Sequence, residues 1–253
     1  MARHPDLSGR SVFITGAARG LGRSMAEMLA DCGAIVGVAD LVLAEAETVA
    51  DHIRSRGGQA HAYSVDVAVR RLFMAAAARF AAHCGRIDAV VNNAMLLKYE
   101  PVEQISEETL TLMTAIGING SVWGAQALLA HYDPQRGGAL INLASPVAEK
   151  GFPNTAAYSA VKGAILTLTK TLAAELGPRN VRVNALSPGS VPTPGAMGLN
   201  DKAEYEKRTR TIPMRRLGRE EDNAEACAFL LSDAASFING EILHVDGGIA
   251  AAG

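Results

Sequence analysis

Several features are scarce in this sequence, and each scarcity excludes a class of protein. The 253-residue chain has three cysteines, Cys32, Cys84 and Cys227, which are isolated from one another in the sequence. It contains no Cys-x-x-Cys pair and no His-x-x-x-His pair. Because disulfide frameworks and zinc sites depend on such spacings, we expect no structural disulfide, no bound metal, and reduced thiols in a cytoplasmic protein.

Excess positive charge and long apolar runs are also lacking. The chain has 24 Lys and Arg residues against 26 Asp and Glu residues, a net charge of −2, without a basic stripe. Nucleic acid is therefore an unexpected partner. No run approaches the roughly 18 apolar residues of a membrane span, and the first nine residues are polar. The 49% hydrophobic and 20% charged composition is that of a globular protein, and we expect one domain over residues 1–253.

A glycine-rich turn follows the first strand-like run, Ser11–Thr15. Gly16, Gly20 and Gly22, with Arg19 and Leu21 between them, lead into a helical pattern that ends before Gly33. Such glycines let the backbone approach a phosphate, and the helix amino terminus offers free N–H groups. The spacing Gly-x-x-x-Gly-x-Gly differs from the usual Gly-x-Gly-x-x-Gly, so a strand-to-helix turn without a ligand is the alternative. The flanking strand and helix favour a dinucleotide site.

Asp40 ends the second strand-like run, 20 positions after Gly20. A carboxylate at that point can hydrogen-bond the ribose hydroxyls of NAD and repels the 2′-phosphate of NADP. Arg19 argues the other way, because a guanidinium can bind that phosphate. We give Asp40 more weight and predict NAD, with NADP as the alternative. The structural alternative for Asp40 is a helix N-cap.

Strand-like and helix-like segments alternate along the chain, which predicts an α/β protein. Seven strands end near residues 15, 40, 65, 92, 144, 186 and 245, and helices span the intervals, including 43–56, 70–84, 156–176 and 223–231. This pattern predicts a doubly wound Rossmann fold with a mostly parallel seven-stranded sheet and helices on both faces. One or two helices are expected in 103–131, and the charged stretch 201–210 belongs to a long loop that follows the sixth strand.

Tyr158 and Lys162 are four positions apart in the helix-like segment 156–176, so their side chains share one helix face. An ammonium near a phenol favours the phenolate and lowers the phenol pKa, which prepares Tyr158 for proton transfer. Ser145 lies thirteen positions before Tyr158, at the end of a strand, where open α/β sheets bind ligands. A Tyr-x-x-x-Lys pair alone is more often an ordinary solvated helix face, so this interpretation depends on the other motifs.

Taken in order, these motifs resemble those of the short-chain dehydrogenase/reductase family in its compact single-domain form. The resemblance covers about residues 6–248 and includes Thr15 and the three glycines, Asn92-Asn93-Ala94, and the Ser145, Tyr158 and Lys162 set. It implies an oxidoreductase acting on secondary alcohols and ketones, with Tyr158 as general acid and base and with Asn119 as a fourth catalytic residue that holds a water. It also implies a homotetramer and cofactor contacts at Asp66, Val67, Asn93, Tyr158, Lys162, Pro188, Gly189, Val191 and Thr193.

The sequence departs from the family at Met95, where the family has glycine. The expected substrate contacts are Met95, Ser145, Val147, Phe152 and Tyr158, and residues 190–215 form a predicted substrate lid. A methionine there either moves the loop slightly or lines the substrate pocket with its thioether. The apolar lining suits a small-molecule alcohol or ketone of moderate size and leaves its identity open.

Two other functions compete with an NAD-dependent dehydrogenase. The nearer one is an NADPH-dependent 3-oxoacyl carrier protein reductase, which shares fold and motifs; Arg19 favours it and Asp40 opposes it. The other is a regulator that binds the cofactor without catalysis. Such proteins usually lack the tyrosine or the lysine, and this chain has both Tyr158 and Lys162.

Overall fold

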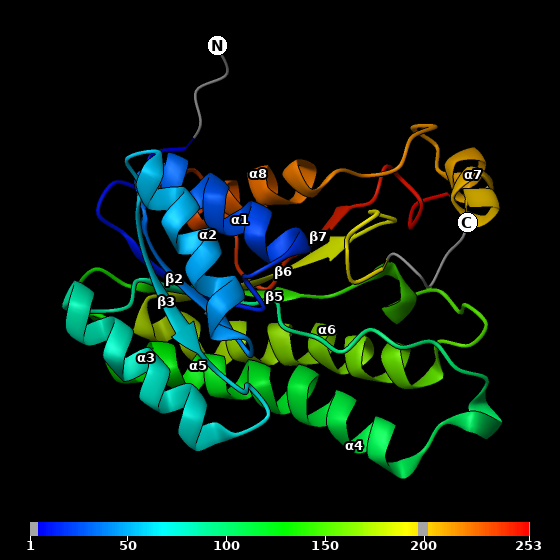
Figure 1. Cartoon of the computed structure of the whole chain (residues 1–253), viewed down its shortest axis with the longest axis horizontal. Coiled ribbons are helices and arrows are strands. Elements are labelled where there is room, and N and C mark those ends of the chain that lie inside the picture. The colour runs from blue at the N-terminus through cyan, green and yellow to red at the C-terminus, as the bar shows by residue number, and fades with distance from the viewer. Residues whose placement is uncertain (1–4, 197–201, 253) are drawn as a thin grey trace.

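The computed structural model describes residues 5–196 and 202–252, which surround a parallel seven-stranded sheet in the order β3-β2-β1-β4-β5-β6-β7 (Figure 1). All six strand pairings are parallel. The strands are β1 (Ser11–Thr15), β2 (Ile35–Asp40), β3 (Gln59–Ser64), β4 (Ala89–Asn92), β5 (Gly138–Leu143), β6 (Val181–Pro188) and β7 (Ile242–Val245). Every residue of the central strands β1 and β4 is buried, which explains why their middle residues are apolar.

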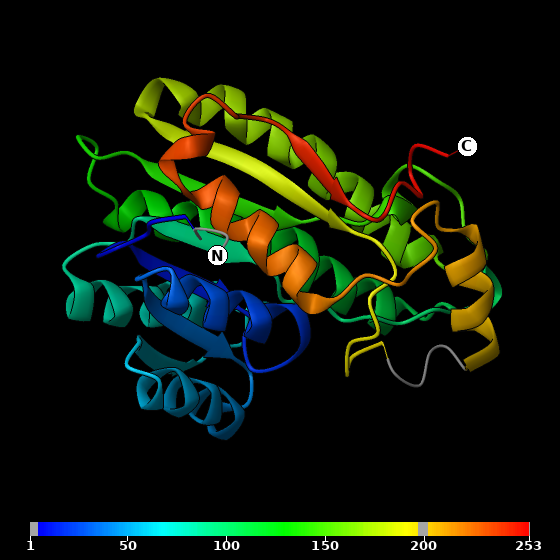
Figure 2. The same ribbon diagram turned by 90° about the horizontal axis from the view of Figure 1, so that it is seen from above.

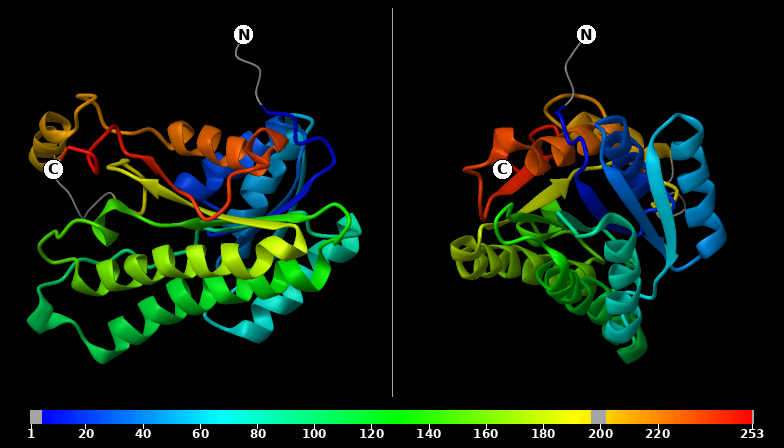
Figure 3. Two further views of the ribbon diagram at one scale, coloured as in Figure 1. Left: turned by 180° about the vertical axis from the view of Figure 1, so that it is seen from behind. Right: turned by 90° about the vertical axis from the view of Figure 1, so that its left-hand side faces the viewer.

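Helices cover both faces of the sheet (Figures 1, 2 and 3). On one face, α1 (Gly20–Asp31), α2 (Leu43–Ser55) and α8 (Glu220–Leu231) share an apolar core with the sheet. On the other, α3 (Arg70–Cys84), α5 (Gly120–His131) and α6 (Ala156–Leu176) enclose a second core around Phe13, Phe73 and Phe80. The predicted doubly wound Rossmann fold is confirmed. None of the helices within 5–196 and 202–252 is long and apolar enough to cross a membrane.

The strand order places β1 beside β4, although β2 and β3 lie between them in the sequence. The winding direction therefore reverses at β1 and β4, and the two loops that leave their carboxyl ends diverge to opposite sides of the sheet. Open α/β sheets bind their ligands in the crevice at this point. Most of the predicted site residues follow the carboxyl ends of these and the neighbouring strands, so the fold directs them to one edge.

Of two segments left open or assigned to a loop, the first contains two helices, as expected, and the second differs from the expectation. Residues 103–131 form α4 (Glu107–Thr114), a π-helical turn η2 (Ala115–Asn119) and α5 in direct succession, after a short 3₁₀ turn η1 (Val102–Gln104). The charged stretch after β6 is not a loop but the helix α7 (Lys202–Thr211), in which Arg208 bonds Glu204 one turn away. The predicted lid, 190–215, thus includes a helix, and its residues 197–201 lie outside the described part of the chain. Short 3₁₀ turns complete the chain: η3 (Pro146–Ala148), η4 (Gly177–Arg179) and η5 (Asp233–Ala235).

Candidate active site

The glycine loop, residues 16–22, connects β1 to α1 and allows two pieces of backbone to touch. A Cβ on Gly22 would lie 2.0 Å from the carbonyl oxygen of Gly16, a distance that no side chain tolerates. Gly16 itself has a φ of +62°, in the left-handed region. The first turn of α1 has no side-chain cap and no acidic residue. Its N–H groups and positive potential are therefore available to an anion such as a phosphate.

Asn93, which follows β4, holds the glycine loop in place. Its side-chain amide donates to the carbonyl oxygens of Thr15 and Gly16 at 3.0 and 2.9 Å. In return, the Thr15 hydroxyl accepts hydrogen bonds from the backbone N–H groups of Asn93 and Ala94. Asn93 was expected to contact the cofactor, and the structure shows that its amide secures the loop across the β1–β4 crevice.

Asp40 ends β2 beside the same loop and is not a helix N-cap, because the residue at the N-cap of α2 is Val42. One carboxylate oxygen of Asp40 accepts from the backbone N–H of Ala18 at 3.0 Å, and the other accepts from Leu41 at 2.8 Å. Each oxygen keeps lone pairs for another donor. Asp40 is therefore fixed next to the glycine loop with its negative charge half-exposed, whereas Arg19 is exposed.

The other predicted cofactor contacts line the same edge of the sheet. Asp66 accepts a hydrogen bond from the Ala68 N–H, and the buried Val67 packs near Gly120 at the start of α5. Pro188 ends β6, and the loop after it, with Gly189 and Val191, folds back toward the glycine loop. A Cβ on Gly20 would lie 3.3 Å from the Cβ of Thr193. Segments from both halves of the chain therefore meet around residues 16–22.

Ser145, Tyr158 and Lys162, which we call the reaction centre, come together beyond the end of β5. The Lys162 Nζ lies 5.5 Å from the centre of the Tyr158 ring and donates a hydrogen bond to the Leu143 carbonyl. The Ser145 hydroxyl lies close enough to the Tyr158 phenol to lower its pKa. The predicted shared helix face is observed: lysine and phenol face each other, and both lie beside the serine at the strand end.

Burial dominates the electrostatics of the reaction centre. It raises the pKa of the Tyr158 phenol, with a further increase from nearby Tyr99 and an opposing effect of the Ser145 hydrogen bond. It also lowers the pKa of Lys162 to about 8. The net direction for the Tyr158 pKa is therefore upward, whereas the sequence predicted a lowered pKa, because desolvation of the phenolate is the largest effect. At neutral pH Lys162 is still mostly charged.

Two other predicted residues have more peripheral positions. Asn119 closes the π-helical turn η2 and is exposed. Met95 packs with Leu96, Met113 and Val161 in a small apolar cluster that also includes Tyr158. A Cβ on Gly117 of the π turn would lie 3.0 Å from the Met95 sulfur. The methionine thus fills space beside the reaction centre that a side chain at position 117 would otherwise occupy.

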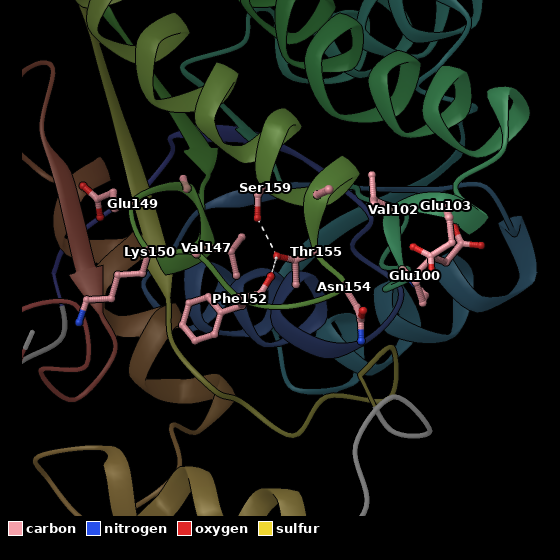
Figure 4. A pocket seen from close by; sticks show the side chains of 14 residues that line it. Glu100, Val102, Glu103, Val147, Glu149, Lys150, Phe152, Asn154, Thr155 and Ser159 are labelled. Atoms are coloured by element: carbon pink, nitrogen blue, oxygen red, sulfur yellow. Dashed lines mark hydrogen bonds between the residues drawn. The ribbon is translucent and has the colours of Figure 1, made fainter.

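A cavity of about 730 Å³ lies next to the reaction centre, between the start of α6 and the loop before α4 (Figure 4). Val147 and Phe152 line it, as do Glu100, Glu103, Glu149 and Lys150, but Ser145, Tyr158 and Lys162 do not. Thr155 and Ser159 are joined by a hydrogen bond at its inner wall. The predicted substrate contacts therefore divide: Met95 clusters with Tyr158, while Val147 and Phe152 face the adjoining cavity.

Tyr99 and Tyr205 were not singled out from the sequence. The Tyr99 ring packs edge-on against Tyr158, with ring centres 5.8 Å apart. Tyr205 comes from α7, and its hydroxyl is buried. Because the three tyrosines come from separate segments, no spacing rule connects them. The only available signal was that these are two of the five tyrosines in a chain with 5% aromatic residues.

With the geometry established, comparison with known proteins identifies the family. Residues 16–250 match the family model described as enoyl-(acyl carrier protein) reductase. D-threitol dehydrogenase of Mycolicibacterium smegmatis is 36% identical over 242 residues, which cover 96% of this chain and 93% of that protein. The chain belongs to the short-chain dehydrogenase/reductase family. It is an oxidoreductase of that family, as the resemblance of its motifs predicted.

Solved structures of the short-chain dehydrogenase/reductase family superpose over nearly the whole chain. A gluconate 5-dehydrogenase from Burkholderia cenocepacia, in complex with NADP and tartrate, has a TM-score of 0.93 and 32% identity, and the match covers 98% of each chain. A 3-ketoacyl-(acyl-carrier-protein) reductase from Brucella melitensis, complexed with NADH, has a TM-score of 0.90 and 34% identity, with 97% of this chain and 100% of that chain covered. Similar structures thus bind either nicotinamide cofactor.

The residues of this chain fit a nicotinamide dinucleotide. The contact between Gly16 and Gly22 leaves the backbone bare at the uncapped start of α1, which suits a pyrophosphate. Asp40 has free lone pairs for ribose hydroxyls. No group of three or more metal-ligating side chains occurs within the described residues 5–196 and 202–252.

Proposed function

We propose that the protein transfers a hydride between NAD and a secondary alcohol or ketone, with Ser145, Tyr158, Lys162 and Asn119 as its catalytic residues. The observation that carries this proposal is the reaction centre itself, in which a phenol lies between a strand-end hydroxyl and a buried ammonium. When bound, the nicotinamide ring supplies or accepts the hydride. The protein has to orient the substrate oxygen and to move one proton.

Each residue has a distinct part in that proton transfer. The Ser145 hydroxyl, which lies beside Tyr158, holds the substrate oxygen close to the phenol. In oxidation the Tyr158 phenolate accepts the hydroxyl proton, and in reduction the phenol donates a proton to the carbonyl oxygen. The charged Lys162 stabilises the phenolate, which burial alone disfavours. The exposed Asn119, at the end of η2, holds a water that connects this centre with solvent.

NAD is the preferred cofactor in this proposal. The Asp40 carboxylate is fixed by Ala18 and Leu41 beside the glycine loop, where it favours ribose hydroxyls and repels a 2′-phosphate. The remaining proposed contacts are the glycine loop with Arg19 and Leu21, Asp66, Val67 and Asn93, and the segment with Pro188, Gly189, Val191 and Thr193. The structure with NADP among the relatives keeps the phosphorylated cofactor as the alternative.

A second candidate is a reductase of 3-oxoacyl groups on a carrier protein. It is favoured by the 34% identity to the 3-ketoacyl-(acyl-carrier-protein) reductase of Brucella melitensis. The cavity that Val147 and Phe152 line offers space next to the reaction centre for part of a larger substrate. The lining of that cavity carries both signs of charge, since Lys150 lines it together with Glu103 and Glu149, and Glu100 is paired with Lys98.

A panel of secondary alcohols with NAD and with NADP, read by the absorbance of the reduced cofactor, tests both candidates. We expect oxidation of at least one alcohol with NAD and a lower kcat/KM with NADP. Reduction of an acetoacetyl thioester with NADPH at a higher kcat/KM than any ketone with NADH would establish the reductase instead. Light scattering on the same preparation measures the oligomeric state and tests the proposed homotetramer. The same substrate panel, run on alanine variants of Met95, Val147 and Phe152, tests whether these side chains contact the substrate.

A further inference from the structure

Two tyrosines beside the reaction centre have no part in the mechanism above. Tyr99, in the loop between β4 and α4, places its ring edge-on against Tyr158, with an interplanar angle of 65°. Tyr205 belongs to α7, which Figure 1 shows on the same side of the molecule as the carboxyl ends of β6 and β7. One comes from the first half of the chain and one from the second, and Tyr99, which contacts Tyr158, also lies close to Tyr205.

The Tyr205 hydroxyl is the unusual group in this cluster. It is buried and has no hydrogen-bond partner among residues 5–196 and 202–252. A buried hydroxyl without a partner costs stability, because folding removes the water that it would otherwise bind. The hydroxyl is therefore suited to a polar group that arrives with a ligand.

Charges near Tyr205 narrow the chemistry of that ligand. Tyr205 and Arg208 both lie close enough to Tyr99 to affect the pKa of its phenol, which burial raises. The Arg208 Nε donates to the Glu204 carboxylate at 3.0 Å, so the charge of Arg208 is paired within α7. A neutral hydroxyl can both donate to a carboxylate and accept from a guanidinium or a phenol.

We propose that Tyr99 and Tyr205 determine substrate specificity by binding a second hydroxyl of the substrate, so that the protein acts on polyols and hydroxyketones in preference to simple secondary alcohols. The aromatic rings pack against the C–H groups of the carbon chain, and the Tyr205 hydroxyl bonds the oxygen beside the reacting carbon. This inference rests on the proposed function, because it extends the same site from the reacting oxygen to its neighbour.

The experiment compares alcohols that differ by the additional hydroxyls. We measure kcat/KM for butane-2,3-diol against butan-2-ol, and for ribitol against pentan-2-ol, with saturating NAD and with saturating NADP. The expected preference of the unaltered protein for the polyhydroxylated member is about 10- to 100-fold. Tyr205→Phe is expected to reduce this preference at least tenfold, because it removes only the buried hydroxyl.

The control is Tyr132→Phe, the same change in a tyrosine at the end of α5, which packs against Arg179 at the amino end of β6, opposite to the sheet edge that holds the reaction centre. It should leave the preference unchanged. Equal kcat/KM values for both members in the unaltered protein would overturn this inference and leave the proposed function intact. A Tyr205→Phe variant that lost both activities to the same extent would also overturn it. If NADH bound but none of the four alcohols reacted, the proposed function would fall, and this inference with it.

Discussion

The glycine loop and the reaction centre occupy the same edge of one sheet, yet their polar groups differ in hydrogen bonding and burial. Around residues 16–22, the amide of Asn93 and the carboxylate of Asp40 are bonded to backbone groups. Around the reaction centre, Lys162 carries its charge in a buried position, and the Tyr205 hydroxyl lacks a partner in the described part of the chain.

The glycine loop is thus a preformed binding surface, whereas the reaction centre and its surroundings contain buried polar groups that a ligand can stabilise. The glycine loop keeps its shape through bonds inside the protein, so a cofactor can bind without reorganising it. The reaction centre holds groups that are destabilised by burial, and such groups gain most when a ligand supplies a partner. Substitutions in the two regions should therefore have different effects, which the following experiments measure.

The largest effect is expected at the reaction centre. Tyr158→Phe removes the phenol hydroxyl beside Ser145, and turnover should fall about 10³-fold or more because proton transfer has lost its group. Binding of NADH, measured by fluorescence titration, should change by less than threefold. Normal turnover in this variant would refute the role of Tyr158 in the mechanism.

A substitution in the glycine loop should lower both the free energy of unfolding and the affinity for the cofactor. In Gly22→Ala the new Cβ meets the Gly16 carbonyl at 2.0 Å, so we expect the free energy of unfolding to fall by about 3 kcal/mol and NADH affinity to fall with it. Gly163→Ala in α6 is the matched control, since nothing lies within 4 Å of its Cβ. Because alanine is the better helix former, this control should gain about 0.5–1 kcal/mol in urea unfolding. Equal stability of the two variants would contradict the predicted contact.

Lys162 should make stability depend on pH. Its native pKa of about 8 lies below the unfolded value of 10.5, so its charge opposes folding below pH 8, and the cost disappears as pH rises toward 10.5. Relative to Lys162→Met, the unaltered protein should gain about 2 kcal/mol of stability between pH 8 and pH 10 in urea unfolding. Lys170→Met, at an exposed position of the same helix, is the control. A constant difference over this range would show that the Lys162 charge is not buried.

The smallest effect is expected for cofactor choice. Asp40→Asn removes the charge that repels a 2′-phosphate and keeps an oxygen for the Ala18 N–H, so the ratio of NADH to NADPH affinity should fall about tenfold. Dissociation constants from fluorescence titration provide the test. If the unaltered protein bound NADPH as tightly as NADH, the assigned role of Asp40 would be wrong.

How much the sequence could predict depended on whether a feature was local. Helices 70–84 and 156–176 have the predicted bounds, because their apolar periodicity and terminal residues are contained in one segment. The proximity of Lys162 to Tyr158 also followed from helical spacing. The helix α7 was not predicted, because its residues are mostly charged or polar and show no apolar periodicity. It also follows a run of prolines and glycines that is typical of loops.

Features that depend on burial or on several segments could not be predicted. The sign of the Tyr158 pKa shift follows from the amount of protein around the phenol, which no local pattern contains. The contact between Tyr99 and Tyr158 joins positions 59 residues apart. The resemblance to a family supplied the reaction centre but said nothing about these neighbours, because they belong to the substrate side of the site.

The π-helical turn η2 has a consequence for the long rod that runs from Glu107 to His131. Such a turn holds more residues than an α-helical one, so the side chains before and after it are rotated relative to a regular helix. Before the turn, α4 packs against α6 and the cluster with Met95; after it, α5 packs against β4 and α3. The rotation at η2 therefore turns the buried face of α4 toward α6 and the buried face of α5 toward β4 and α3.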